Sequence, residues 1–384
     1  MRKFLTPAAS ALRQGEIRAF FDKAKNYENV INLGIGEPDL DTPQPIIDAA
    51  YEAMLTGHTH YTANAGELAV REQVAEYLAE FGVKADPKTE IILTIGGMGA
   101  VAQSLLCTVE KGDGVLIQDP QWLNYRSQVR FAQGQPIPVP AYQTHGFALQ
   151  AEEIEKYITP QTKILMLNSP NNPTGAVMSR EELERVAEVA IRNDLLVISD
   201  EVYCEMLYDG QKHNSIAAIP GMKERTIVIN SFSKSYSMTG WRIGFAAGPA
   251  HIIAKLTVLQ ENLVACAPAF AQWAARYALE SKCMLREMRE IYQRRRDLIV
   301  EGLNSISGIH CEKPKGAFYV FPNISSFGKT SQEVAEMLLA QAHVVTIPGS
   351  AFGENGEGFL RMSYANAEEN IREALRRIRK CLEG

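Results

Sequence analysis

The chain has 384 residues, of which 46% are hydrophobic and 22% are charged, and its formal net charge is −6. This length suits about two compact domains, and the composition is typical of a soluble globular protein. The negative charge excludes a general attraction for nucleic acid or an anionic membrane, and the lack of a long apolar stretch or signal-peptide core predicts a cytoplasmic protein.

Short apolar runs alternate with helical patterns through the middle of the chain. Helices are expected at residues 100–109 and 180–192, and a capping box of Ser179 and Glu182 opens the second. The strands are expected at residues 91–95, 115–118, 163–168, 195–199 and 226–230. Their nearly continuous apolar character indicates strands that are covered on both faces. This alternation predicts a doubly wound, mostly parallel α/β sheet.

The pattern changes after about Pro268, where a long helical region runs to residue 303. Beyond it, strands are expected at residues 317–321 and 359–364, and helices at residues 331–342 and 368–382. Thr330 and Glu333 form a second candidate capping box. These elements predict a smaller α/β domain. The expected division is an N-terminal arm with part of the small domain (1–44), a large domain (45–275) and a small C-terminal domain (276–384).

Unusual residues follow the predicted strands. In open parallel sheets, ligands bind at the carboxyl ends of the strands. The residues found there are Gly97, Trp122, Asn172, Asp200 and Lys234. Together they suit a phosphorylated, aromatic, electrophilic cofactor. The six cysteines include no CxxC pair and the seven histidines show no HExxH spacing, so no metal site is expected.

Lys234 is the strongest single candidate for chemistry. Its amine can form a Schiff base with an aldehyde and can later shuttle protons. A lysine after a strand is usually a solvated surface residue, but here Ser231 and Ser233 precede it and Arg242 follows it. Hydroxyls and a guanidinium are suited to bind phosphate. The amide of Gly97, at the start of a helix, would add to the same anion site.

The remaining candidates suit the ring of such a cofactor. Asp200 is either a structural carboxylate or the partner of a protonated pyridine nitrogen. Tyr203 and Asn172 are candidates to donate to the phenolic oxygen of the ring. Trp122 is either an ordinary core aromatic or a plate that stacks on the ring face.

Seven segments of the sequence resemble the class I aminotransferases of pyridoxal-phosphate (PLP) fold type I, the aspartate aminotransferase superfamily. They are GEPDLDTP (36–43), YTANAG (61–66), NSPNNPTG (168–175), SDEVY (199–203), SFSKSYSMTGWRIG (231–244), GAFYVFP (316–322) and FLRMSYA (359–365). The resemblance implies a PLP-dependent aminotransferase, which moves an amino group from an L-amino acid to a 2-oxo acid. It also implies that the large domain binds PLP.

The resemblance assigns a role to each matching residue. Lys234 would carry PLP and move the proton, with Asp200 at the pyridine nitrogen. Tyr203, Asn172 and Trp122 would bind the ring as described above. The phosphate would be held by Ser231, Ser233, Arg242 and the amides of Gly97 and Met98. Tyr61 would reach the phosphate of the neighbouring subunit, which implies a homodimer with shared active sites. Arg361 would bind the substrate carboxylate, helped by Gly36 and Asn172.

The sequence leaves the amino donor open. Some aspartate-specific relatives have a lysine near the position of Met98 that engages the second carboxylate, which Met98 cannot do. The segment 15–21 is expected to fold over the site, bringing Ile17 or Phe20 near the substrate, although Arg18 in the same segment offers a cation. Neutral or aromatic donors are therefore expected, with aspartate or glutamate accepted too. The alternatives are another fold-type-I PLP enzyme, such as a C–S lyase, and a PLP-sensing regulatory domain.

Overall fold

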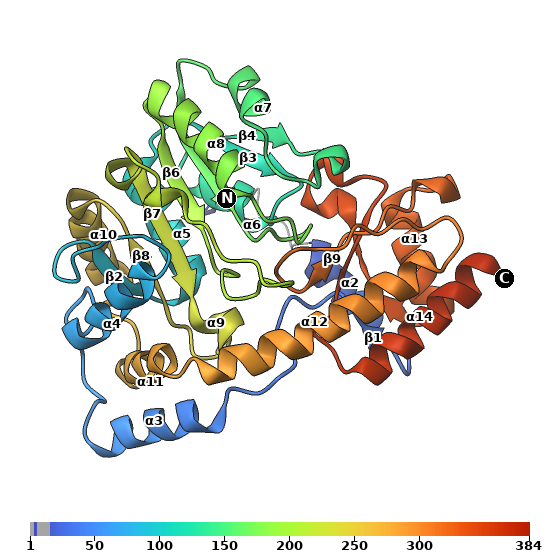
Figure 1. Ribbon diagram of the computed structural model, residues 1–384, viewed down its shortest axis with the longest axis horizontal. Coiled ribbons are helices and arrows are strands. Elements are labelled where there is room, and N and C mark those ends of the chain that lie inside the picture. Colours follow the sequence, from blue (N-terminus) through green and yellow to red (C-terminus); the bar gives the residue numbers. More distant parts are fainter. Residues whose placement is uncertain (1–3, 6–15) are drawn as a thin grey trace.

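The computed structural model describes residues 4–5 and 16–384 and centres on a seven-stranded sheet (Figure 1). The strand order is β2-β8-β7-β6-β5-β3-β4. Only β8 runs antiparallel to its neighbours β2 and β7, so the sheet is mostly parallel, as predicted. The strands are β2 (Ile91–Thr94), β3 (Gly114–Asp119), β4 (Gln135–Pro140), β5 (Thr162–Asn168), β6 (Leu196–Asp200), β7 (Thr226–Ser231) and β8 (Gly244–Ala247).

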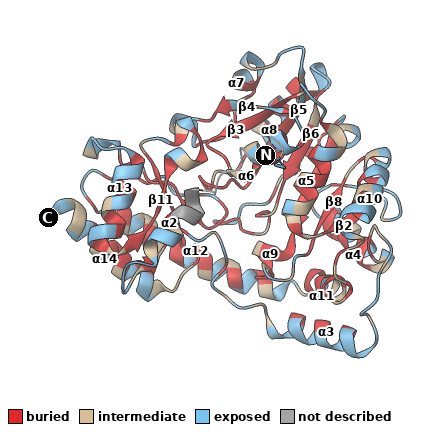
Figure 2. Cartoon of the chain, turned by 180° about the vertical axis from the view of Figure 1, so that it is seen from behind, coloured by how far each residue is buried: buried red, intermediate tan, exposed pale blue. Residues whose placement is uncertain are grey.

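Helices cover both faces of this sheet. Successive residues of a strand point to opposite faces. Val115 and Ile117 of β3 pack in one hydrophobic cluster with α5 (Gly96–Thr108), α6 (Asn124–Phe131) and α10 (Ala250–Val264). Leu116, between them, packs in another cluster with α7 (Ala151–Lys156) and α8 (Arg180–Arg192). Apart from β4, the strands of the sheet are accordingly buried for most of their length (Figure 2).

A smaller region lies beside the sheet and is built from both ends of the described chain (Figure 1). β1 (Ile31–Asn32) pairs in parallel with β10 (Val344–Val345), and β12 (Leu360–Ser363) lies between β11 (Ile347–Pro348) and β9 (Tyr319–Val320) in an antiparallel sheet. Phe20 and Leu33 share one hydrophobic cluster with residues of the C-terminal region. Three helices complete the region: α12 (Cys283–Asn304), α13 (Ser331–Met337) and α14 (Glu368–Glu383).

Five further α-helices are described: α2 (Glu16–Ala24), α3 (Gln44–Leu55), α4 (Leu68–Ala79), α9 (Phe232–Ser235) and α11 (Ala269–Glu280). Of these, α4 and α11 pack in one hydrophobic cluster with strands β2, β7 and β8. Among the described residues, no helix combines the length and apolar character needed to cross a membrane. The proposed domain boundaries stay a prediction.

Both predicted capping boxes are confirmed. The Ser179 hydroxyl accepts from the Glu182 amide at 3.2 Å, and the Glu182 carboxylate accepts from the Ser179 amide at 2.7 Å. Thr330 and Glu333 make the same pair of bonds before α13. The strands expected in the central sheet are also confirmed, with ends shifted by one residue. The helix expected from residue 100 begins earlier, at Gly96, and the long helical region after Pro268 is divided into α11 and α12.

Candidate active site

A cavity of about 320 Å³ lies at the carboxyl ends of the central strands and reaches the small region. Tyr61 does not line it and is 88% exposed. The cavity brings together all the other predicted site residues: Gly36, Gly97, Met98, Trp122, Asn172, Asp200, Tyr203, Ser231, Ser233, Lys234, Arg242 and Arg361. Residues more than 300 positions apart in the sequence therefore meet in one place.

The Lys234 amine points into this cavity from α9, directly after β7. Its Nζ donates to the carbonyl oxygen of Gly36 at 2.6 Å. Burial lowers the pKa of Lys234 to about 8, and the nearby cations Arg361 and Arg242 act in the same direction. A lysine in such surroundings loses its proton more easily than a surface lysine does, which suits an amine that must act as a nucleophile or a base.

Asp200 ends β6 with its carboxylate facing the cavity. The Tyr125 hydroxyl donates to its Oδ2 at 2.6 Å, and the Val202 amide donates to its Oδ1 at 3.3 Å. Burial raises the pKa of Asp200 to about 6, although both hydrogen bonds oppose that rise. A cation that entered the cavity beside Asp200 would favour its ionised form. The site therefore suits a positively charged partner such as a protonated ring nitrogen.

One end of the cavity is suited to an anion. Helix α5 begins at Gly96, whose φ of +65° favours glycine, and a Cβ there would lie 2.6 Å from the Arg242 guanidinium. A Cβ on Gly244 would lie 2.8 Å from the Gly97 amide nitrogen. Glycines thus allow close approach where a helix N-terminus meets Arg242. The Ser231 hydroxyl donates to that of Ser233 at 2.8 Å, and both serines line the cavity with Arg242.

The opposite end of the cavity holds a buried arginine. Arg361 of β12 donates from one terminal nitrogen to the Asn172 side-chain oxygen at 3.2 Å and from the other to the Gly34 carbonyl. The guanidinium lies between Tyr319 and Phe352, at 4.8 and 4.9 Å from the two ring centroids. Its Nε is buried and has no hydrogen-bond partner among the described residues. Arg361 is held in place with donor capacity to spare, which suits recognition of a carboxylate.

Aromatic side chains form the walls. Trp122 meets Tyr125 edge to face, with centroids 5.1 Å apart at 83°. The Tyr203 hydroxyl lies 2.9 Å from that of Tyr319. Five further residues line the cavity that had no role predicted from the sequence: Tyr125, Asn168, Val202, Thr239 and Tyr319. Asn168, Val202, Thr239 and Tyr319 lie inside segments that carried the family resemblance, and that was the only available signal.

Phe20 was expected near the substrate, in a segment folded over the site, and the structure places it elsewhere. Phe20 is 3% exposed, packs in the hydrophobic cluster of the small region and does not line the cavity. The side chains of Ile17 and Arg18 lie outside the described part of the structure. Met98 does line the cavity and is 44% exposed.

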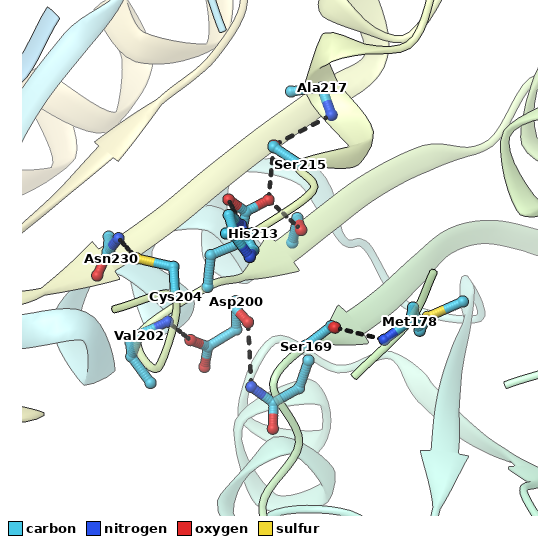
Figure 3. A network of polar contacts seen from close by, with 12 residues as sticks. Ser169, Met178, Asp200, Val202, Cys204, His213, Ser215, Ala217 and Asn230 are labelled. Atoms are coloured by element: carbon cyan, nitrogen blue, oxygen red, sulfur yellow. Dashed lines mark hydrogen bonds and ion pairs between the residues drawn. The ribbon is translucent and has the colours of Figure 1, made fainter. Parts of the chain in front are cut away.

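A second polar group lies beside the site (Figure 3). The Glu201 carboxylate accepts from the hydroxyls of Ser199 and Ser215, both at 2.8 Å, and its other oxygen is 2.7 Å from Nε2 of His213. Figure 3 shows His213 and Ser215 above Asp200, whose carboxylate accepts a hydrogen bond from the Val202 amide. Glu201 does not line the cavity. It holds together the segment that follows β6.

Comparison with known proteins gives an independent result. The family model for aminotransferases of class I and II matches residues 28–378. "Aromatic-amino-acid aminotransferase 2" of Thermococcus litoralis is 44% identical, over 98% of each chain. An aspartate aminotransferase of Pyrococcus abyssi is 46% identical, over 96% of this chain and 95% of its own. The solved structure of aspartate aminotransferase from Thermus thermophilus with maleate has a TM-score of 0.93 and 37% identity and is matched over 100% of both chains.

Proposed function

Since this chain belongs to the class I and II aminotransferases, we propose that it binds PLP in the described cavity and transfers amino groups between an L-amino acid and a 2-oxo acid. The observation that carries this proposal is the shared cavity itself. An amine (Lys234), a carboxylate (Asp200) and a guanidinium (Arg361) line it together. These groups match the aldehyde, the ring nitrogen and the substrate carboxylate that the reaction has to handle.

The residues present fit PLP. Its phosphate would lie at the start of α5, within reach of Ser231, Ser233 and Arg242, because that end offers amides, hydroxyls and a permanent cation. The amides of Gly97 and Met98 would take part. At the ring, Trp122 would stack, Asp200 would face the nitrogen, and Tyr203 and Asn172 would donate to the phenolic oxygen. Asn172 is oriented for this task, since its side-chain oxygen already accepts from Arg361 and leaves its NH₂ group free to donate.

PLP, when bound, supplies the aldehyde that captures the amino group and a ring that withdraws electrons. The chain supplies the rest. Lys234 holds or moves a proton at Nζ, which its lowered pKa favours. Asp200 stabilises positive charge at the ring nitrogen in surroundings poor in water. Arg361 orients the substrate through its carboxylate.

We propose aromatic or neutral amino acids as donors, with aspartate accepted as well. The cations that line the cavity among the described side chains are Lys234, Arg242 and Arg361, and each already has a role. Met98 offers an adaptable apolar surface that suits varied side chains. The relatives named above include both an aromatic-amino-acid and an aspartate aminotransferase. kcat/KM for phenylalanine, methionine, alanine and aspartate, each with 2-oxoglutarate, tests this. A preference for aspartate over phenylalanine of more than roughly 10⁴-fold would contradict it.

We also propose a cytoplasmic homodimer in which Tyr61 contacts the phosphate site of the partner subunit. In the isolated chain Tyr61 is 88% exposed. The preceding helix α3 also exposes much of its surface (Figure 2), including Tyr51 at 61% and Leu55 at 64%. Large exposed apolar side chains grouped in this way are typical of an interface. Tyr61→Phe should weaken retention of PLP, and a monomer that retains full activity would contradict the shared site.

Labelling the lysine tests the core of the proposal. Borohydride reduction of the enzyme with PLP should fix the cofactor mass on the peptide that contains Lys234. Lys234→Ala should abolish turnover and still bind PLP without a covalent bond, because the phosphate and ring contacts remain. Cofactor mass on a different lysine would refute the assignment. Dependence of the reaction on an added 2-oxo acid separates amino transfer from elimination.

A further inference from the structure

Two tyrosine hydroxyls join the central-sheet side of the cavity to the small-region side. Tyr203 follows β6 of the central sheet, and Tyr319 belongs to β9 of the small region. Their hydroxyl oxygens are 2.9 Å apart, and their rings meet edge to face with centroids 5.8 Å apart at 82°. Both residues are almost completely buried, at 3% and 1% exposure. The contact is therefore a fixed part of the cavity wall.

The number of hydrogens sets the direction of this bond. Each hydroxyl carries one hydrogen, and among the described residues neither hydroxyl makes another hydrogen bond. Buried hydroxyls rarely remain without a partner. If Tyr203 donates to the phenolic oxygen of PLP, as proposed above, the hydrogen between the two tyrosines has to come from Tyr319. Tyr319 would then hold the Tyr203 hydroxyl in the orientation that points its hydrogen at the cofactor.

The ring of Tyr319 serves a different neighbour. It lies against the Arg361 guanidinium, 4.8 Å from the ring centroid. Its hydroxyl also lies close to Gly36, where a Cβ would be only 2.6 Å from the oxygen. Gly36 in turn accepts the hydrogen bond of Lys234. Tyr319 thus contacts Arg361 at the end suited to a carboxylate and Tyr203 at the expected position of the cofactor ring.

We propose that Tyr319 is a positioning residue with two separable roles. Its hydroxyl directs the Tyr203 hydroxyl at the cofactor, and its ring holds the Arg361 guanidinium in the plane that receives the substrate carboxylate. This inference rests on the proposed function, because it takes PLP and an amino acid as the ligands.

The experiment separates the hydroxyl from the ring. Tyr319→Phe removes only the hydroxyl, whereas Tyr319→Leu removes the ring as well. Tyr203→Phe and the double variant Tyr203→Phe/Tyr319→Phe complete a cycle. Tyr364→Phe is the matched control, since this buried tyrosine donates to the Ala317 carbonyl at 3.0 Å and does not line the cavity. Two properties of the holoenzyme are measured: the ratio of the absorption bands of bound PLP at one pH, and the dissociation constant of 3-phenylpropionate, which is phenylalanine without its amino group.

The two properties should respond differently. Tyr319→Phe should change the band ratio about threefold, in the same direction as Tyr203→Phe, because one buried hydrogen bond is lost. The double variant should match Tyr203→Phe, and Tyr364→Phe should match the wild type. Binding of 3-phenylpropionate should stay within about twofold in Tyr319→Phe and weaken about fivefold or more in Tyr319→Leu, through the lost contact with Arg361.

Three results would overturn the inference. They are a Tyr319→Phe band ratio equal to that of Tyr364→Phe, a double variant whose change is the sum of the two single changes, and equal binding losses in Tyr319→Phe and Tyr319→Leu. Failure of the proposed function looks different. In that case Tyr203→Phe itself would leave the spectrum unchanged, or Arg361→Ala would leave binding of 3-phenylpropionate intact.

Discussion

Two neighbouring carboxylates, Asp200 and Glu201, have opposite surroundings although both are buried. Glu201 accepts from two serine hydroxyls and pairs with His213. Asp200 accepts one hydrogen bond at each oxygen, and one of them, from Val202, is long at 3.3 Å. A carboxylate has about four acceptor sites, so Asp200 keeps unused capacity that faces the cavity.

The difference separates a structural group from a functional one. A buried carboxylate with three hydrogen-bond partners stabilises the segment that carries it. A buried carboxylate with few hydrogen-bond partners destabilises the cofactor-free protein, and a cation that binds beside it offsets this cost. Substitutions at the two positions should therefore affect different properties of the enzyme.

Removing Glu201 should have the largest effect, and the effect should be on stability. Glu201→Ala leaves His213 and two serine hydroxyls without their acceptor in a buried place. The free energy of unfolding should fall by about 3 kcal/mol or more, because each buried group left without its partner costs roughly 1–3 kcal/mol. Glu201→Gln should lose less, because its amide still offers one acceptor and one donor. Chemical denaturation of the three proteins measures this, and an unchanged unfolding midpoint in Glu201→Ala would remove the structural role.

Asp200→Ala should instead reduce catalysis. The rate of α-proton removal should fall on the order of 10²-fold or more, by analogy with other preorganised electrostatic groups. Single-turnover measurement with excess enzyme isolates this step. The unfolding midpoint of the variant should stay well above that of Glu201→Ala. Near-normal single-turnover kinetics would remove Asp200 from the mechanism.

The pH dependence of stability should test the surroundings of Asp200 as well. Burial raises the pKa of Asp200 to about 6 from an ordinary value of 3.8. The folded, cofactor-free protein then binds more protons than the unfolded chain between about pH 4 and 6, so its stability falls as the pH rises through this window. Asp200→Asn removes that loss. The cofactor-free variant should be more stable than the wild type by about 3 kcal/mol at pH 8, with the gain vanishing near pH 4.

Unfolding of both cofactor-free proteins at pH 4, 6 and 8 gives the measurement. Glu201→Gln is the control and should show no gain at any of these values. A constant difference between Asp200→Asn and the wild type across the range would show that burial does not perturb Asp200 in the folded protein.

The sequence predicted the central sheet well where apolar runs were continuous, and less well elsewhere. β4 has prolines at positions 136, 138 and 140, which argue against a strand. It forms because it is the edge strand, paired only with β3, where the missing amides cost little. The start of α5 was also misplaced, because two glycines oppose a helix in isolation and are tolerated here by the close contacts with Arg242 and Gly244.

The site divides in the same way. Residues with distinctive chemistry at strand ends, such as Lys234 and Asp200, could be predicted because parallel strands bring their carboxyl ends together. Tyr125 could not, since it reads as an ordinary aromatic residue of a helix. The pairing of Glu201 with His213 depends on the path of the loop between them, which leaves no periodic signal in the sequence.

Tyr125→Phe should have the smallest of these effects and should depend on pH. The Tyr125 hydroxyl donates to Asp200 at 2.6 Å, and this bond lowers the pKa of the carboxyl against the effect of burial. Without it the pKa of Asp200 rises further, so a smaller fraction is ionised near neutral pH. A hydrogen bond to a charged group contributes about 1.5 kcal/mol or more, so the affinity of the cofactor-free protein for PLP, whose ring nitrogen would pair with the ionised carboxylate, should fall about tenfold at pH 6. At pH 8.5, where Asp200 is ionised in both proteins, the loss caused by Tyr125→Phe should be smaller than at pH 6. Tyr364→Phe is again the matched control, because its buried hydroxyl donates to the backbone carbonyl of Ala317 and not to a carboxylate. If both variants lose the same factor at both pH values, Tyr125 contributes packing alone. The difference between Asp200 and Glu201 would then have a cause other than their hydrogen-bond partners.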